Sequence, residues 1–124
     1  MTRILVIDDN IEVREMLLLM LKRAGYRAIG VENGRVGINH HRMFPFDIII
    51  TDIIMPEKEG IETIIELKRD YPDVKIIAIS GGGKIDSNLY LTMAEKFGAD
   101  RVMAKPFDMI ELLAVVEELS GAGS

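Results

Sequence analysis

The sequence predicts an α/β fold in which one doubly wound parallel sheet carries helices on both faces. Short apolar runs rich in β-branched residues recur along the chain, and each run is followed by a segment with helical periodicity. The runs are apolar throughout, which is typical of strands buried on both faces. Because each parallel step needs a crossover, five such strands alternating with five helices predict a single three-layered domain.

The size and composition of the chain are those of one soluble globular domain. Its 124 residues are 48% hydrophobic and 28% charged, enough to build one core. The absence of cysteine excludes disulfides and thiolate chemistry. No apolar run suits a signal peptide or a membrane span, so we expect a cytoplasmic protein with no membrane partner. The net charge of −5 and the scattered basic residues argue against direct nucleic-acid binding.

The first strand is expected at residues 4–7 and the first helix directly after Asn10. The segment Asp8-Asp9-Asn10 supplies two carboxylates and a candidate helix N-cap. Gly25 is expected to end the helix as a C′ glycine. The inner stripe of this helix, with i, i+4, i+7 and i+8 spacing, consists of Val13, Leu17, Met20, Leu21 and Ala24.

The second strand is expected at residues 27–31, and a helix at residues 35–43 ends before a proline. Asn33-Gly34 between them is interpreted as a turn. Two adjacent histidines, His40 and His41, lie in this helix, but adjacent helical residues point in different directions and no third metal ligand is evident. We therefore expect both histidines to be surface residues.

The third strand is the centre of the predicted sheet. Three consecutive isoleucines follow Asp47, polarity returns at Asp52, and Pro56 cannot donate to a sheet ladder. Asp52 should therefore lie at the carboxyl end of a central strand. In open parallel sheets, that edge is where ligands bind.

The second half of the chain repeats the alternation. A helix with Ile61, Ile64 and Ile65 on one face should end near Asp70, because Pro72 disfavours helical geometry at the residue before it. Strands are expected at residues 75–80 and 101–104, joined by a triple-glycine loop at residues 81–83 and a fourth helix that Gly98 ends. That helix has Leu89, Met93 and Phe97 on one side. The inner stripe of the last helix is Met109, Leu112, Leu113, Val116 and Leu119. Residues 1–120 thus form the domain, and residues 121–124 form a flexible tail.

Ionisable and polar residues follow the carboxyl ends of four different strands: Asp8-Asp9, Asp52, Ser80 and Lys105. Three carboxylates at one edge repel one another, and a hard divalent cation such as Mg²⁺, which prefers oxygen ligands, relieves that repulsion. Lys105 and Ser80 are suited to phosphate oxygens, as a point charge and a hydrogen-bond donor. Asp52 is then the natural nucleophile, because a carboxylate can accept a phosphoryl group.

These motifs resemble the receiver domains of two-component response regulators, with a chemotaxis-regulator-like organisation. The resemblance covers residues 3 to about 119. It rests on motifs that follow one another at the expected strand ends: Asp8-Asp9, Asp52 with Met55-Pro56 and Gly60, Ser80, and Lys105-Pro106-Phe107. The resemblance implies a flavodoxin-like fold with strand order 2-1-3-4-5.

The resemblance also implies a role for each matching residue. Asp52 is expected to be the phospho-acceptor, Ser80 the switch hydroxyl, and Lys105 the side chain that holds the phosphoryl group. The Lys105-Pro106 peptide is expected to be cis. The implied Mg²⁺ ligands are Asp8, mostly through water, Asp9, Asp52 and the backbone carbonyl of Ile54.

The implied function is signalling through a phosphorylation-controlled binding surface. A sensor histidine kinase or phosphotransfer protein is the expected phosphoryl donor, and a downstream protein target or an output domain is the expected partner. Such a domain catalyses its own phosphorylation and dephosphorylation but is not a turnover enzyme.

Some positions depart from the family pattern. Val102 stands where these domains commonly carry Tyr or Phe, so an aromatic rotamer switch is not expected. Movement of the loop at residues 81–83 and of the fourth helix is expected instead. Ile54 and Gly82, two positions beyond the acceptor and the switch hydroxyl, cannot hydrogen-bond an attacking water through their side chains.

Two other functions fit parts of the pattern. A Mg²⁺-dependent phosphatase or phosphotransferase also uses an aspartyl phosphate, but its dehalogenase-like members need an acid at the position that Ile54 occupies. A phosphorylation-independent interaction domain would not need all of the site residues. Simpler interpretations are a loop-capping Ser80 and a solvated Lys105. The segment Gly81-Gly82-Gly83-Lys84 lacks the spacing of a phosphate-binding loop.

Overall fold

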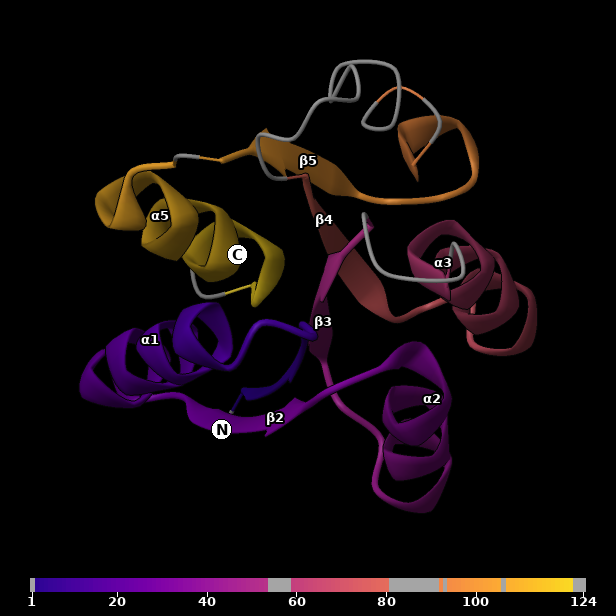
Figure 1. Ribbon diagram of the computed structural model, residues 1–124, viewed down its shortest axis with the longest axis horizontal. Coiled ribbons are helices and arrows are strands. Elements are labelled where there is room, and N and C mark those ends of the chain that lie inside the picture. Colours follow the sequence, from indigo (N-terminus) through magenta and orange to yellow (C-terminus); the bar gives the residue numbers. More distant parts are fainter. Residues whose placement is uncertain (1, 54–58, 81–91, 93, 106, 122–124) are drawn as a thin grey trace.

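A computed structural model shows a central parallel sheet with helices packed on both of its faces (Figure 1). It describes residues 2–53, 59–80, 92, 94–105 and 107–121. The strands are β1 (Arg3–Ile7), β2 (Arg27–Val31), β3 (Ile48–Asp52), β4 (Lys75–Ser80) and β5 (Arg101–Ala104). The helices are α1 (Ile11–Arg23), α2 (Gly34–Met43), α3 (Glu59–Asp70) and α5 (Met109–Leu119), and residues 92 and 94–96 belong to the remaining helix. None of the helices described is long and apolar enough to cross a membrane.

The sheet has the predicted order β2-β1-β3-β4-β5, and all of its strands are parallel. In the register, Ile7 pairs with Thr51, Asp52 pairs with Ile79, and Ser80 pairs with Ala104. The carboxyl ends of β1, β3, β4 and β5 therefore meet along one edge of the sheet. This register places the residues that follow those strands beside one another.

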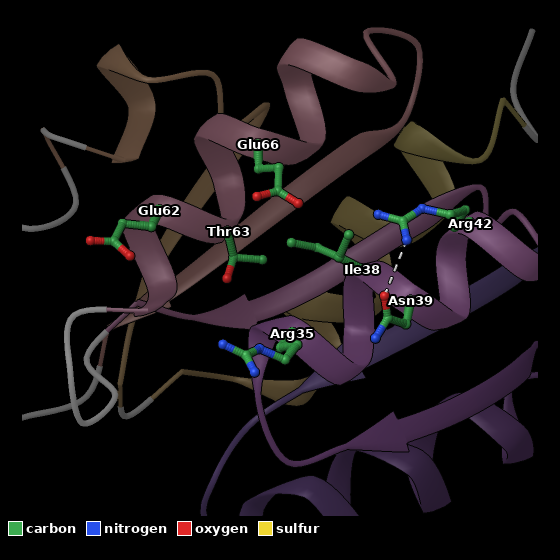
Figure 2. A pocket seen from close by; sticks show the side chains of 7 residues that line it. All are labelled: Arg35, Ile38, Asn39, Arg42, Glu62, Thr63 and Glu66. Atoms are coloured by element: carbon green, nitrogen blue, oxygen red, sulfur yellow. Dashed lines mark hydrogen bonds between the residues drawn. The ribbon is translucent and has the colours of Figure 1, made fainter.

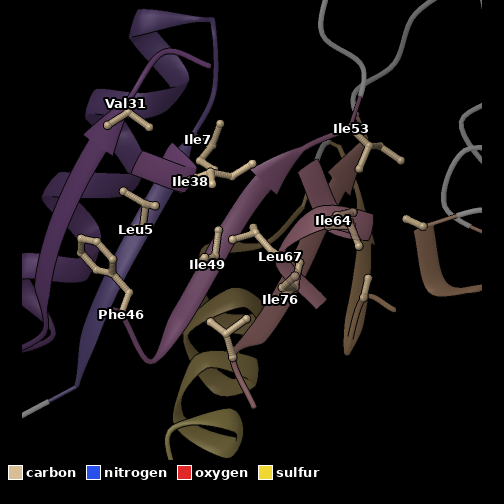
Figure 3. Close-up of a cluster of buried hydrophobic side chains, with 14 residues drawn as sticks. Leu5, Ile7, Val31, Ile38, Phe46, Ile49, Ile53, Ile64, Leu67 and Ile76 are labelled. Carbon is tan, nitrogen blue, oxygen red and sulfur yellow. The ribbon is translucent and has the colours of Figure 1, made fainter. Parts of the chain in front are cut away.

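The core is divided by the sheet into two apolar layers. One layer packs α2 and α3 against the sheet through side chains such as Ile38, Ile64 and Leu67 (Figure 3). The other layer packs α1 and α5 against the opposite face through Leu17, Leu21, Leu112 and Val116. The isoleucines of β3 alternate between the layers: Ile49 contributes to the first, and Ile48 and Ile50 to the second. This arrangement confirms that the central strand is buried on both faces.

Helix α1 has the two capping residues that the sequence predicts. The side chain of Asn10 accepts hydrogen bonds from the amides of Glu12 at 2.9 Å and Val13 at 3.2 Å. At the other end, Gly25 has a φ of +97°, a conformation that favours glycine. The amide of Tyr26 donates to the carbonyl of Leu21, and the amide of Gly25 to that of Lys22, which is the Schellman pattern.

The bounds of α2 and two members of the apolar stripes differ from expectation. Asn33 is the N-cap of α2, and Gly34 is the first helical residue and not part of a separate turn. A side chain at Gly34 would overlap Thr63 of α3, so the close approach of the two helices requires glycine there. Ala24 and Ile65, which were expected on inner faces, are exposed. Leu67, six residues after Ile61 in α3, is buried instead.

The expectation that His41 lies on the surface is wrong, although His40 is exposed. The His41 side chain is only 2% exposed and packs against the rings of Phe46 and Tyr71. Its Nδ1 accepts a hydrogen bond from the Phe46 amide at 3.0 Å. Burial lowers the pKa of His41, because the charged imidazolium is poorly solvated there. The segment after α2 folds back over the helix end and covers this ring, which helical periodicity does not reveal.

The buried His41 predicts a specific pH dependence of stability. Its folded-state pKa lies below its unfolded-state value, so the unfolded chain takes up a proton first as the pH falls. The contribution of His41 should therefore be complete above about pH 6.5 and decline below it. In urea unfolding at pH 8 and pH 5.5, His41→Asn, which keeps an acceptor without a titrating group, should lose less stability on acidification than the unchanged protein. His40→Asn is the matched control, and an equal acid response in all three proteins would contradict the prediction.

Candidate functional site

The carboxyl edge of the sheet brings together the acidic residues that the sequence singled out. Asp8 and Asp9 follow β1, and Asp52 is the last residue of β3. One carboxylate oxygen from each of the three lies within 4.8 Å of the others. Asp8 is 1% exposed and Asp52 is 7% exposed, whereas Asp9 faces solvent. The predicted acidic cluster therefore forms, with two buried members and one open to solvent.

Lys105, which follows β5, brings a cation into this cluster. Its Nζ lies 3.2 Å from Asp52 Oδ2 and 3.5 Å from Asp8 Oδ2. One ammonium therefore contacts two buried carboxylates, with a third carboxylate close by. Like charges held close together are costly unless they are compensated, and among the described residues one ammonium faces three carboxylates. The electrostatics of the site therefore favour a further cation.

Asp8 is held at each of its polar groups. Its amide donates to the Val31 carbonyl of β2 at 3.1 Å, and its Oδ1 accepts from the Asn10 amide at 2.9 Å. Its main-chain carbonyl accepts from Arg14 Nη1 at 2.7 Å. Together with the contact from Lys105, these bonds fix the turn between β1 and α1. The orientation of the acidic pair is thus built into the fold.

The backbone around Asp52 is equally constrained. The Ile53 amide donates to the Ile79 carbonyl at 2.9 Å, and the Thr51 hydroxyl donates to the Asp52 carbonyl at 3.2 Å. An added Cβ at Gly60, near the start of α3, would lie 2.7 Å from the same Asp52 carbonyl oxygen. The first turn of α3 therefore packs directly on the chain that follows Asp52.

Ser80 ends β4 beside this site and is fully buried. Its Oγ has no hydrogen-bond partner among the residues that the structure describes. The main chain at this position is firmly held, because the Lys105 amide donates to the Ser80 carbonyl at 2.7 Å. A buried hydroxyl without a partner is costly, so this O–H group can donate a hydrogen bond to an incoming acceptor.

The donor atoms at this edge suit a hard divalent cation. Three carboxylates supply only oxygen, which is the ligand type that Mg²⁺ prefers. The expected contribution of the Ile54 carbonyl lies outside the described residues. So do the Lys105-Pro106 peptide, the loop at residues 81–83, most of the fourth helix and residues 122–124.

A separate hollow of about 260 Å³ lies between α2 and α3 (Figure 2). Its wall contains arginines, glutamates and uncharged residues. The lining residues are Arg35, Ile38, Asn39, Arg42, Glu62, Thr63 and Glu66. None of the three clustered aspartates lines it. The site chemistry therefore belongs to the edge of the sheet and not to this hollow.

Val102 and Arg14 are two further residues near the site. Val102 is partly buried against the apolar layer on the α2 and α3 side, and no aromatic ring occupies this position. Arg14 was not identified from the sequence, although it bonds the Asp8 carbonyl. The available signal was Gly30 within β2, because glycine inside a strand often marks the close approach of another group.

Comparison with known proteins agrees with this geometry. Residues 4–117 match the family model of the response regulator receiver domain. The chain is 33% identical over 119 residues to the chemotaxis protein CheY of Thermotoga maritima, covering 95% of this chain and 97% of that protein. It is 35% identical over 114 residues to the response regulator GtcR of Aneurinibacillus migulanus, covering 92% of this chain but only 46% of that protein.

A solved structure shows the same arrangement. The response regulator TrrA of Thermotoga maritima, solved in complex with Mg²⁺ and BeF, superposes with a TM-score of 0.84 at 32% identity. The alignment covers 96% of this chain and 99% of that one. The similarity therefore extends over nearly the whole of both chains.

The charge imbalance at the acidic edge predicts how stability responds to Lys105. Lys105→Met should lower the free energy of unfolding by about 3 kcal/mol without Mg²⁺, because two buried carboxylates lose their counterion. Saturating Mg²⁺ should restore more stability to this variant than it adds to the unchanged protein, since the metal supplies the missing charge. Urea unfolding with and without Mg²⁺ measures both effects, and exposed Lys75→Met is the matched control. Equal responses of all three proteins to Mg²⁺ would contradict the prediction.

Proposed function

Because the chain belongs to the response regulator receiver family of two-component systems, we propose that it is switched by phosphorylation of Asp52 in a Mg²⁺-dependent reaction. The observation that carries this proposal is the position of Asp52. It is a buried carboxylate at a strand end, 3.2 Å from the Lys105 ammonium and close to two further acids. Among the three clustered aspartates, Asp52 alone lies on the central strand of the sheet.

In the proposed reaction, a carboxylate oxygen of Asp52 attacks the phosphorus of the donor. The bond between phosphorus and the leaving group breaks, its electron pair departs with the leaving group, and an aspartyl phosphate forms. The Lys105 ammonium stabilises the negative charge on the phosphoryl oxygens during transfer. Hydrolysis by water later returns Asp52 to a carboxylate and releases phosphate.

The residues at the acidic edge fit a bound Mg²⁺. Asp9 and Asp52 would be direct ligands, and Asp8 would act mostly through bound water. When bound, Mg²⁺ neutralises charge on the phosphoryl oxygens and reduces repulsion between the acceptor and the donor. The complex of TrrA with Mg²⁺ and BeF supports the assignment.

The proposed output is binding and not turnover. The Ser80 hydroxyl has no partner in the described structure and would donate to a phosphoryl oxygen on Asp52, which couples the phosphate to the end of β4. A sensor histidine kinase or phosphotransfer protein is the proposed donor. A downstream protein target or an output domain is the proposed receiver of the signal. The chain spans 46% of the length of GtcR, so that relative has further sequence outside the matched part.

The first test is covalent labelling. With acetyl phosphate and Mg²⁺, intact-mass measurement should show the addition of one phosphoryl group, and Asp52→Asn should show none. Asp47→Asn, at the exposed residue just before the same strand, is the matched control and should label normally. A label that persists in Asp52→Asn would place the phosphorylation on another residue.

A second test separates metal binding from folding. Asp9→Ala should abolish phosphorylation at moderate Mg²⁺, because it removes a metal ligand together with its charge. Its metal-free stability in urea should be equal to or higher than that of the unchanged protein, since one repelling carboxylate is gone. Asp73→Ala, an exposed acid just before β4 and therefore at the opposite edge of the sheet, should change neither property. Phosphorylation of Asp9→Ala at the normal rate would show that Asp9 is not a ligand.

A further inference from the structure

Arg14 connects α1, β1 and β2 through a single extended side chain. It belongs to α1, and its Nη1 donates to the main-chain carbonyl of Asp8 at 2.7 Å. Its aliphatic part crosses Gly30 of β2: an added Cβ there would lie 2.8 Å from Arg14 Cγ and 3.0 Å from Cδ. The side chain thus reaches the acidic turn by passing over the one residue of β2 that has no side chain.

Glycine at position 30 is explained by this crossing. Glycine inside a strand is unfavourable because it gives up conformational entropy and packs no side chain. Leu18 approaches the same place, with its Cδ1 also 2.8 Å from an added Cβ. Any other residue would displace Leu18, Arg14 or both. The absence of a side chain at Gly30 therefore leaves space on the sheet for these two side chains of α1.

The bond from Arg14 acts on the peptide that joins the two acids. The Asp8 carbonyl belongs to the peptide unit that leads into Asp9, so fixing this carbonyl fixes the plane of that peptide. Within the described structure, the Asp9 carboxylate has no side-chain hydrogen bond or ion pair of its own. The backbone before Asp9 therefore sets where its Cα–Cβ bond points, and with it the positions that the carboxylate can reach. The Asp8 amide is held from β2 as well, by the Val31 carbonyl.

Arginine suits this task better than lysine. Its guanidinium stays charged at any pH of interest and donates from a rigid planar fork, which makes a charge-assisted bond to a carbonyl both strong and directional. Groups that orient metal ligands without touching the metal commonly change metal affinity by about 10-fold to 100-fold when they are removed.

We propose that Arg14 is a positioning residue that orients Asp9 for Mg²⁺ through the Asp8-Asp9 peptide, and that Gly30 is required to seat it. This inference rests on the proposed function, because it assumes that the acidic edge binds Mg²⁺. It assigns to the edge strand β2 a part in metal affinity, although β2 contributes no ligand.

The test compares Arg14→Met, which keeps the aliphatic part but removes the donor, with Arg14→Lys and Gly30→Ala. Arg23→Met, an exposed arginine at the end of the same helix, is the matched control. Mg²⁺ binding is measured by titration of backbone amide chemical shifts, and phosphorylation by acetyl phosphate is measured across Mg²⁺ concentrations. Amide hydrogen exchange of Asp9 and Asn10 without metal provides a readout that does not need the loaded site.

Arg14→Met should weaken Mg²⁺ binding about 10-fold and shift the Mg²⁺ midpoint of phosphorylation equally, with a much smaller change in the rate at saturating Mg²⁺. Exchange at Asp9 and Asn10 should be faster. Arg14→Lys should give an intermediate midpoint. Gly30→Ala should raise the Mg²⁺ midpoint as Arg14→Met does. The double variant Arg14→Met with Gly30→Ala should have a midpoint no higher than that of the more affected single variant, because both changes remove the same contact.

A normal Mg²⁺ midpoint in Arg14→Met, or a lower saturating rate without a midpoint shift, would overturn the role of Arg14. If Arg14→Met does not fold, Arg14→Lys decides the question, and a normal midpoint there has the same meaning. If the unchanged protein neither binds Mg²⁺ nor takes up a phosphoryl group, the proposed function fails and not this inference alone. If the wild-type protein binds Mg²⁺ and is phosphorylated, a raised Mg²⁺ midpoint in Arg14→Met therefore identifies the positioning role.

Discussion

Repulsion among three carboxylates at one edge of the sheet is the constraint on which the rest of this structure depends. Carboxylate oxygens of Asp8, Asp9 and Asp52 lie within 4.8 Å of one another, and among the described residues only Lys105 forms an ion pair with any of them. The fold tolerates this cost because rigid strands position each group and main-chain bonds hold the connecting turns. The same unbalanced charge makes the site receptive to a metal ion and to a phosphoryl group that arrives with it.

The support for this edge comes from parts of the sheet that carry no ligand. Strand β2 holds the Asp8 amide through Val31 and offers Gly30 as the seat of Arg14. Gly60 allows α3 to lie against the carbonyl of Asp52. Small residues at these two positions let neighbouring elements approach the acidic turns closely, so the geometry of the site is set by packing as much as by the acids themselves.

Ser80 differs from these supporting residues. Its main chain is fixed by a bond from Lys105, whereas its buried hydroxyl has no partner in the described part of the structure. A fixed backbone with an unused donor gives a group that can respond to a new acceptor without first breaking an existing bond. Val102 stands where an aromatic residue is expected in related domains. An aromatic ring movement at this position is therefore not possible in this protein.

The strands, both ends of α1 and the last residues of α2 and α3 could be predicted from the sequence. Burial on both faces imposes continuous apolar runs on the strands, and Asn10 and Gly25 act through local hydrogen bonds. The convergence of Asp8, Asp9, Asp52, Ser80 and Lys105 also followed from strand ends, since parallel strands share one carboxyl edge. Only the tertiary structure decided that His41 is buried, that Ile65 is exposed and that Arg14 crosses Gly30. Those outcomes depend on how close two elements approach each other, and periodicity within one element carries no information about its neighbour.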